Sequence, residues 1–250
     1  MSFGKFAILT MILLSLTFFS CQKKPQKIWL HRANDIEKVQ YFQDKYAGLE
    51  IDVTYVDSLH TFLIFHGGGH VESNPVTFEK WLEQIENTRK IRLWLDFKNI
   101  NSRNKVVILN ELNRICAKHK LRKGNLIVES NNADCLPLFR EAHYRTSYYI
   151  PKFNPEETSD FDIQRYTCKI RREISENDIT TISGYYYQYE FMRDSFPDEN
   201  IFLWYHMYDT MIRNQYIELA NNDDRVKILL VADEVPADWQ KVKDQSRDKK

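Results

Sequence analysis

Short apolar runs alternate with longer amphipathic stretches along most of this chain. Apolar runs of about four to eight residues are typical of buried strands, whereas apolar positions three or four apart indicate a helix. On this basis, strands are predicted at residues 28–30, 49–55, 61–65, 91–98, 126–129, 146–150, 180–184, 201–204 and 227–231. Helices are predicted at residues 35–46, 77–88, 102–119, 132–142, 155–176, 186–194 and 208–221.

This alternation predicts a closed α/β barrel. The run at 61–65 is expected to fold back on 49–55 as a hairpin, which leaves eight strands separated by helical stretches. Repeated strand–helix units favour parallel pairing, and eight of them favour a (β/α)8 TIM-type barrel, regular or distorted. An open doubly wound sheet is less favoured, because no Gly-rich phosphate-binding loop follows the first strand. The barrel is expected at 28–240, followed by a charged tail at 241–250.

The residues before the barrel have the pattern of a bacterial lipoprotein. Residues 6–19 form an apolar run of a length that suits a signal peptide, and the sequence turns polar directly after Cys21. We therefore expect a signal peptide at 1–20, a lipid on Cys21 and a tether at 21–27. The protein would then be anchored to a membrane in the bacterial cell envelope, facing the periplasm or the cell surface. A plain secretory peptide or a retained anchor is the alternative.

The amino-acid composition bears on whether the chain binds nucleic acid, holds zinc or forms disulfides. The 250 residues include 35 Lys+Arg and 35 Asp+Glu, so no basic excess indicates binding to nucleic acid. Besides Cys21 the chain has Cys116, Cys135 and Cys168, an odd number without Cys-x-x-Cys spacing. This pattern predicts neither a zinc site nor a disulfide framework, and three free thiols are expected. One bridged pair in an oxidising periplasm is the alternative.

Polar groups that can do chemistry stand at the ends of the first three apolar runs. His31 follows the first run, and His66 follows the third. Glu50 and Asp52 lie two residues apart on the second run, and that spacing points both carboxylates to one side of a strand. Two carboxylates that share a cation, with two imidazoles that move protons, suit metal-assisted cleavage of a phosphate ester.

Two further features add to these candidate catalytic residues. Asp96 and Lys98 repeat the spacing of two at the end of the run 91–98. Gly67–Gly69 form a glycine triplet beside His66, where a backbone without side chains can approach an anionic substrate closely. In a TIM-type barrel all these strand ends meet at one mouth, which is where catalytic groups lie.

These residues also resemble a known family. His31-Arg32, Glu50-x-Asp52 and the histidine fourteen residues after Asp52 resemble the opening of the glycerophosphodiester phosphodiesterases. That family belongs to the superfamily of phospholipase-C-like phosphodiesterases. The pattern Trp-x-His-x-x-Asn that ends at Asn34 is also similar to the menorin-like branch of the superfamily. Farther on, the run ending at Trp204 and the segment 231–236 resemble the family's late strand and closing turn.

The resemblance implies metal-dependent cleavage of a glycerophosphodiester or a related lipid-derived envelope phosphodiester. It implies that Glu50, Asp52 and Asp96 bind a divalent cation, and oxygen ligands suit Mg²⁺ or Ca²⁺ alike. The family most often has Glu where this chain has Asp96, and a shorter carboxylate would move the ion or admit a water. His31 and His66 are expected to act as general base and general acid.

The basic residues are expected to bind the phosphate. Arg32 suits a two-pronged contact and Lys98 a point charge, whereas either alone is also a plausible ion-pair partner of the acids. Asn34 is expected to donate to the phosphate or to hold the first loop, and a helix cap is the alternative. The other histidines fall into two groups: His60, His119 and His143 are expected to be structural, and His70 and His206 are left open.

A second function is consistent with the same residues. Ala33 stands where the family has Gly, and Gly67 stands where it has Asp, which removes a partner that would orient His66. A catalytically degenerate barrel that works as a lipid-anchored binding module is therefore the alternative. The aromatic segment 185–191 is a candidate ligand surface in that case, although a buried helix face is the favoured interpretation. A structural envelope lipoprotein would leave the strand-end acids and histidines unexplained.

Overall fold

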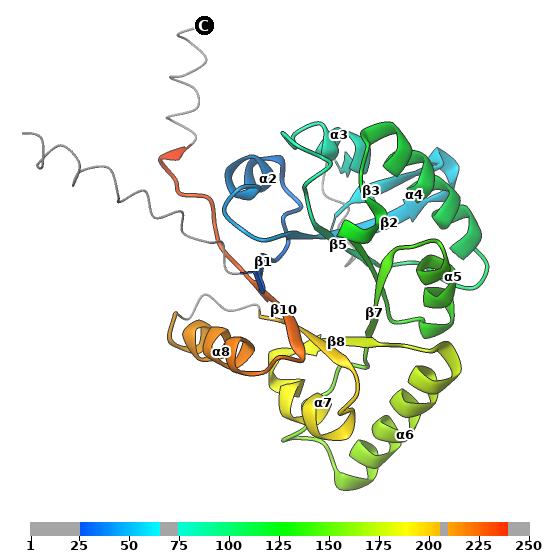
Figure 1. Cartoon of the computed structure of the whole chain (residues 1–250), viewed down its shortest axis with the longest axis vertical. Coiled ribbons are helices and arrows are strands. Elements are labelled where there is room, and N and C mark those ends of the chain that lie inside the picture. The colour runs from blue at the N-terminus through cyan, green and yellow to red at the C-terminus, as the bar shows by residue number, and fades with distance from the viewer. Residues whose placement is uncertain (1–25, 66–74, 206–209, 240–250) are drawn as a thin grey trace, which may run out of the picture.

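The computed structural model describes residues 26–65, 75–205 and 210–239, which form a closed barrel (Figure 1). Within these residues eight parallel strands pair in a ring, and β1 pairs with both β10 and β2 to close it. The strands are β1 (Ile28–Leu30), β2 (Leu49–Val56), β5 (Leu93–Phe97), β6 (Leu126–Ser130), β7 (Arg145–Tyr149), β8 (Thr181–Tyr185), β9 (Asn200–Trp204) and β10 (Val226–Val231). The predicted (β/α)8 barrel is thereby confirmed.

Helices surround the ring of strands (Figure 1). They are α2 (Ile36–Phe42), α3 (Phe78–Leu82), α4 (Lys105–His119), α5 (Leu136–Glu141), α6 (Asp160–Asn177), α7 (Tyr189–Ser195) and α8 (Thr210–Asn222). The hairpin predicted between β2 and the following run is also present, since β3 (Thr61–Ile64) pairs antiparallel with β2 and then with the short strand β4 (Val76–Thr77). None of the described helices is both long and apolar enough to cross a membrane.

Each barrel strand has one face toward the helices and one face toward the barrel axis. On β2 the apolar residues Leu49, Ile51 and Val53 belong to the large core under the helices. The alternate residues Glu50 and Asp52 point the other way, since successive side chains of a strand alternate. Helix packing thus fixes the strand register, and the register fixes where the acids lie.

A small apolar core fills the inside of the barrel below the acids. It is made of Trp29, Trp94, Ile127, Phe202, Trp204, Ile228 and Leu230. The rings of Trp94 and Phe202 are 5.1 Å apart, and a Cβ on Gly48 would lie 2.4 Å from the ring of Trp29. Glycine is therefore required at this position, because the indole occupies the space of a side chain. This small apolar core, called the barrel plug below, closes the centre of the barrel. The acids of β2 are therefore open toward one mouth of the barrel only.

Two helices end several residues before their predicted last residue. The helix expected at 77–88 ends at Leu82, yet Ile85 is still buried, from a turn. The helix expected at 35–46 ends at Phe42, and Tyr46 packs its ring edge against Phe42 at 5.6 Å from the turn that follows. In both places the helical spacing of apolar residues predicted burial correctly and helix length incorrectly. The cysteines Cys116, Cys135 and Cys168 are free thiols, and only Cys168 is exposed.

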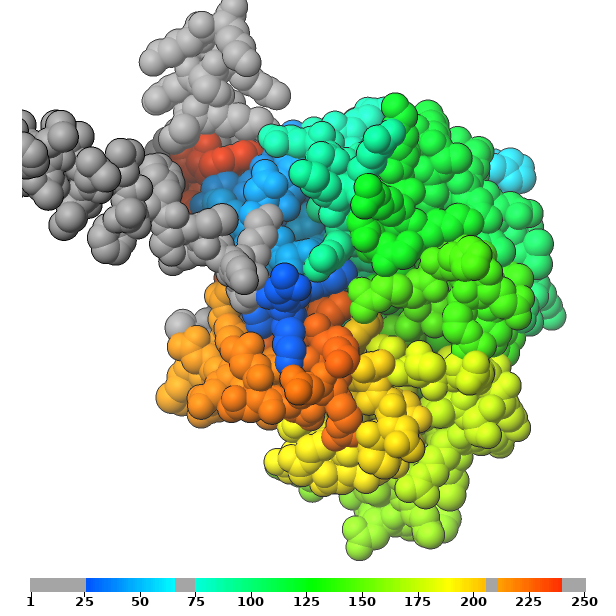
Figure 2. Space-filling model, viewed as in Figure 1, coloured from blue at the N-terminus to red at the C-terminus, as the bar shows by residue number. Residues whose placement is uncertain are grey.

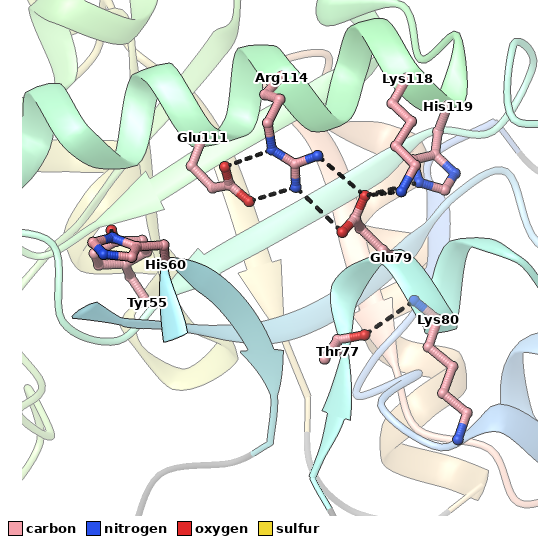
Figure 3. Close-up of polar contacts among 9 residues, drawn as sticks. All are labelled: Tyr55, His60, Thr77, Glu79, Lys80, Glu111, Arg114, Lys118 and His119. Atoms are coloured by element: carbon pink, nitrogen blue, oxygen red, sulfur yellow. Dashed lines mark hydrogen bonds and ion pairs between the residues drawn. The ribbon is translucent and has the colours of Figure 1, made fainter. Parts of the chain in front are cut away.

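An ion-pair cluster ties α3 to α4 (Figure 3). The carboxylate of Glu79 on α3 accepts from Lys118 at 2.8 Å and pairs with Arg114 at 3.2 Å, both on α4. His119 Nε2 lies 3.4 Å from the same carboxylate. The hydrogen bond from Lys118, together with the contacts of Arg114, lowers the pKa of Glu79 to about 2.

This cluster predicts a pH-dependent effect on stability. The folded-state pKa of Glu79 lies below the unfolded value of about 4.5, so the stabilisation is fully present above that value and is lost as the pH falls toward 2. Glu79→Gln is expected to lower the free energy of unfolding at pH 7 by about 1 kcal/mol, discounted for solvent exposure, or about 2–4 °C in Tm.

Thermal melts of both proteins from pH 7 to pH 3 check this expectation. The Tm difference should shrink as the pH falls. Glu111→Gln is the matched control, since Glu111 pairs with Arg114 within α4 and does not join the two helices. An undiminished difference at pH 3 would show that the carboxylate charge is not the cause.

Candidate active site

The candidate catalytic residues gather at the carboxyl ends of three neighbouring strands. His31 directly follows β1, Glu50 and Asp52 lie on β2, and Asp96 lies near the end of β5. The strand register places Asp52 opposite Asp96. In parallel barrels this end of the strands is the one on which catalytic groups are built. The arrangement predicted from strand-end spacing is the one observed for these four residues.

Three carboxylates form a compact acidic cluster. Glu50, Asp52 and Asp96 each offer an oxygen, and these oxygens lie within 4.8 Å of one another. Glu50 and Asp52 are only 2% exposed. Burial, reinforced by the negative charges of Asp52 and Asp96, raises the pKa of Glu50 well above its usual range. The cluster is therefore a place where a bound cation would relieve repulsion between buried charges.

The loop after β1 wraps around Glu50. Arg32 has a left-handed backbone, with φ of 52°, and its N–H donates to Glu50 Oε2 at 2.7 Å. The N–H of Ala33 donates to the carbonyl oxygen of Glu50 at 2.8 Å. The indole of Trp81 donates to the carbonyl oxygen of Ala33 at 2.9 Å, which locks the loop from the α3 side. The unusual backbone of Arg32 is thus held by bonds on both sides.

Asn34 holds Asp52 with two hydrogen bonds. Its Nδ2 donates to Asp52 Oδ2 at 2.7 Å, and its Oδ1 accepts from the backbone N–H of Asp52 at 2.9 Å. Its side chain makes no hydrogen bond that caps α2, whose N-cap residue is Asp35. Phosphate binding, holding of the first loop and capping of a helix were the roles expected for Asn34. These two hydrogen bonds favour the second role, in which Asn34 holds the loop after β1 against β2.

Lys98 supplies positive charge to the acidic cluster. Its Nζ lies 2.5 Å from Asp52 Oδ1 and also donates to Asp96 Oδ2. Burial disfavours the charged ammonium, but the charges of Asp96, Asp52 and Glu50 outweigh burial and raise the pKa of Lys98. Lys98 is therefore a fixed cation at this mouth of the barrel.

His31 lies against the acidic cluster. It is 7% exposed, its Nε2 is 3.7 Å from Glu50 Oε2, and its backbone N–H donates to the carbonyl oxygen of Val231. The imidazole therefore lies beside the buried carboxyl groups at this mouth of the barrel.

The same mouth encloses a cavity of about 200 Å³. Besides the residues already described, its lining includes Glu129, Tyr149, Tyr185, Trp204 and Leu230. Glu129 was not predicted from the sequence as a site residue. It lies on β6 opposite Asp96, is 1% exposed and accepts a hydrogen bond from Ser183 Oγ. Burial, with the charge of Asp96, raises its pKa well above the usual range.

Aromatic rings form one wall of the cavity. The ring of Trp204 lies 4.6 Å from that of Tyr149 and 5.2 Å from that of Tyr185, and Lys152 Nζ stands 4.5 Å above Tyr185. Only the first residue of the predicted aromatic segment 185–191 lines the cavity. Later members such as Tyr189 are buried in the outer core, as the favoured interpretation expected for a helix face.

The fold matches solved structures of phosphodiesterases. A glycerophosphodiester phosphodiesterase from Parabacteroides distasonis is 16% identical with a TM-score of 0.58, and the match covers 90% of this chain and 99% of that chain. Another from Thermotoga maritima is 14% identical with a TM-score of 0.54, covering 81% of this chain and 92% of that chain. This chain has the glycerophosphodiester phosphodiesterase fold.

A third match with the glycerophosphodiester phosphodiesterase fold carries a ligand. A phosphodiesterase from Oleispira antarctica, solved in complex with the product sn-glycerol-3-phosphate, is 11% identical with a TM-score of 0.56. The match covers 82% of this chain and 92% of that chain. No family model and no curated protein matches this sequence. The expected resemblance to these phosphodiesterases is therefore confirmed at the level of the fold.

The residues present fit the divalent cation that this resemblance implies. Two oxygens bound to one Ca²⁺ at about 2.4 Å are at most about 4.8 Å apart, and the three carboxylate oxygens lie within that distance. Mg²⁺, which binds oxygens at about 2.1 Å, would draw them to within about 4.2 Å. All three donors are hard oxygen ligands, and two of them, Glu50 and Asp52, are buried. The donor set accepts either ion, and it contains no nitrogen or sulfur that would favour zinc.

Several predicted residues lie outside the part of the chain that the structure describes. These are His66 with Gly67–Gly69, His70, His206 and Cys21. The last described pairing before His66 joins Ile64 of β3 to Val53 of β2, next to Asp52. Away from the cavity, His60 lies 3.5 Å from the Tyr55 hydroxyl, and His119 contacts Glu79 (Figure 3).

Proposed function

We propose that the chain hydrolyses a phosphodiester, with a divalent cation held by Glu50, Asp52 and Asp96. The observation that carries this proposal is the meeting of three carboxylates, Lys98 and His31 at the catalytic mouth of a glycerophosphodiester phosphodiesterase fold. The substrate class is a glycerophosphodiester or a related small phosphodiester, since the Oleispira antarctica neighbour was solved with sn-glycerol-3-phosphate.

The chain's own residues supply charge and proton transfer. A bound cation would polarise the phosphate and stabilise the charge that develops on its oxygens. His31 acts as general base or general acid, and its Nε2 lies 3.7 Å from Glu50 Oε2. His66 supplies the second proton-transfer group, so that one histidine removes a proton from the attacking oxygen and the other protonates the leaving alcohol.

Lys98 and Arg32, the two basic residues at this mouth of the barrel, bind the phosphate of the substrate. Lys98 is fixed between Asp52 and Asp96, so its charge faces a phosphate bound above the carboxylates. Arg32 lines the same cavity and presents a guanidinium suited to a two-pronged contact. Asn34 is a positioning residue in this scheme, because it acts on Asp52.

The decisive experiment is hydrolysis by the full chain of bis-p-nitrophenyl phosphate and a panel of glycerophosphodiesters. Turnover is expected with Mg²⁺ or Ca²⁺, loss of turnover with EDTA, and recovery when the ion returns. Phosphorus NMR of the products separates attack by water from attack by a substrate hydroxyl, since the second route passes through a cyclic phosphate. Absence of turnover with every ion and substrate would overturn the proposal.

A catalytically degenerate, lipid-anchored binding module is the second candidate. One observation favours it: Lys98 bridges Asp52 and Asp96, which is the place that a metal would take. In such a protein the ammonium replaces the ion permanently. Thermal melts separate the two functions, because an ion that binds raises Tm, whereas a site satisfied by Lys98 shows no rise with Mg²⁺ or Ca²⁺.

We also propose that the barrel at 28–240 is carried by an envelope lipoprotein. The signal peptide at 1–20 and the tether at 21–27 support this from the sequence. The intact mass of the chain recovered from membranes is the test, and it should correspond to a lipid-modified chain that begins at Cys21.

A further inference from the structure

A basic rim surrounds the opposite mouth of the barrel, where the strands begin. It consists of Lys27 before β1, Arg92 before β5, Arg145 at the start of β7 and Lys227 near the start of β10. These side chains line a hollow of about 320 Å³ together with the apolar floor residues of the barrel plug. Four cations thus meet around one opening, at the end of the barrel away from the acidic cluster.

Little negative charge neutralises the basic rim. The one acidic residue in the lining is Asp224. Among the described residues, no salt bridge involves Arg92, Arg145 or Lys227, and all three are exposed. Lys27 differs from them, because its Nζ donates to the carbonyl oxygens of Ala220 at 2.7 Å and Asp223 at 3.0 Å. Three cations therefore remain available to an anion.

Two arginines of the basic rim repel each other. The guanidinium of Arg145 stands 5.7 Å from the ring centroid of Phe202, which belongs to the apolar core inside the barrel. Partial burial there, together with the charge of Arg92, lowers the pKa of Arg145 below its usual value. Two like charges that act on each other in the lining of one hollow favour an anion that binds between them.

The chain also enters the barrel at this mouth. Figure 2 shows the first described residues, in dark blue, at the surface beside the β10 segment, in orange. Lys23 and Lys24 precede them in the sequence, and Gln26 is five residues after Cys21. Five residues reach at most about 17 Å. A lipid on Cys21 would hold the basic rim within that distance of the phospholipid headgroups.

From this placement we propose that the basic rim docks on the headgroups of anionic phospholipids. A membrane surface with many phosphate groups can pair with Arg92, Arg145 and Lys227 at the same time. Each basic residue near an anionic bilayer adds to the attraction. The catalytic mouth then faces away from the membrane. The proposal does not depend on catalysis, so its failure and the failure of the proposed function are separate results.

The test uses the full chain on vesicles of phosphatidylcholine, with and without phosphatidylglycerol. Because the apolar run at 6–19 can hold the chain on either vesicle, the readout is arginine labelling by phenylglyoxal, measured residue by residue by mass spectrometry. Labelling of Arg92 and Arg145 is expected to fall at least about tenfold on vesicles with phosphatidylglycerol only. Labelling of Arg103, which follows β5 at the catalytic end, should not change. High salt should restore labelling.

A charge reversal in the basic rim adds an independent comparison. Lys227→Glu should weaken the protection of Arg92 and Arg145, whereas Lys169→Glu, an exposed residue on α6, should leave it intact. Circular dichroism confirms that both variants are folded.

Four results would overturn the proposal. They are equal labelling on both vesicles, equal protection of Arg103, protection by inorganic phosphate alone and protection by an acidic polypeptide but not by phosphatidylglycerol. The third would indicate a site for a small free anion, and the fourth would indicate a protein partner.

Discussion

Replacing Glu50 with Gln is expected to abolish metal-dependent turnover and to raise the melting temperature of the metal-free protein. Turnover should fall by at least about 10³-fold, because a metal ion contributes several kcal/mol to stabilisation of the transition state and Glu50 is one of its three proposed ligands. The rise in Tm caused by Mg²⁺ or Ca²⁺ should fall with it.

The gain in stability has a separate physical cause. Glu50 is 2% exposed and shares its surroundings with Asp52 and Asp96, so its charge is costly in the absence of an ion. Gln keeps an oxygen that can accept from the N–H of Arg32 and removes the charge. A gain of about 1 kcal/mol corresponds to about 2–4 °C in Tm for a protein of this size.

Steady-state kinetics and thermal melts with and without metal measure both effects. Glu83→Gln is the matched control, since Glu83 is exposed at the end of α3 and its change should affect neither quantity. A Glu50→Gln variant that retains metal-dependent turnover would remove Glu50 from the proposed metal site.

His31→Gln should reduce kcat by about 10²–10⁴-fold while leaving the metal-induced rise in Tm intact. The expected loss reflects proton transfer, since the imidazole lies 3.7 Å from Glu50 and lines the cavity. The pH–rate profile should also lose one of its two limbs, because one titrating group has been removed.

This prediction separates a proton-transfer role from a metal-binding role. His119→Gln is the control, because His119 contacts Glu79 between α3 and α4. Unchanged kcat would show that His31 takes no part in proton transfer. Loss of the metal-induced rise in Tm would show that His31 acts through the ion site instead.

The sequence was sufficient to predict the barrel and the grouping of the strand-end acids. Both depend on short-range patterns: strand and helix alternate along the chain, and residues two apart, such as Glu50 and Asp52, share a face of one strand. Once β2 and β5 are known to be parallel neighbours, Asp96 must lie near Asp52.

The rest of the cavity was harder to predict, because it depends on which strands meet across the barrel. Glu129 ends the apolar run 126–129, so a signal for it was present in the sequence. Tyr149 and Trp204 end apolar runs too, but aromatic residues there are as typical of a core as of a cavity wall. The packing of Ile85 and Tyr46 from turns, likewise, cannot be distinguished by spacing from packing on a helix.

If the chain works as the proposed metal-dependent hydrolase, the bridge from Lys98 to Asp52 and Asp96 bears on when the ion would bind. Because an internal cation already offsets part of the carboxylate charge, closure of the barrel does not require an ion. Folding and metal loading would then be separate events. The supply of divalent ions around the mature protein would determine what fraction of it is active, and it would have little influence on how much of it is folded.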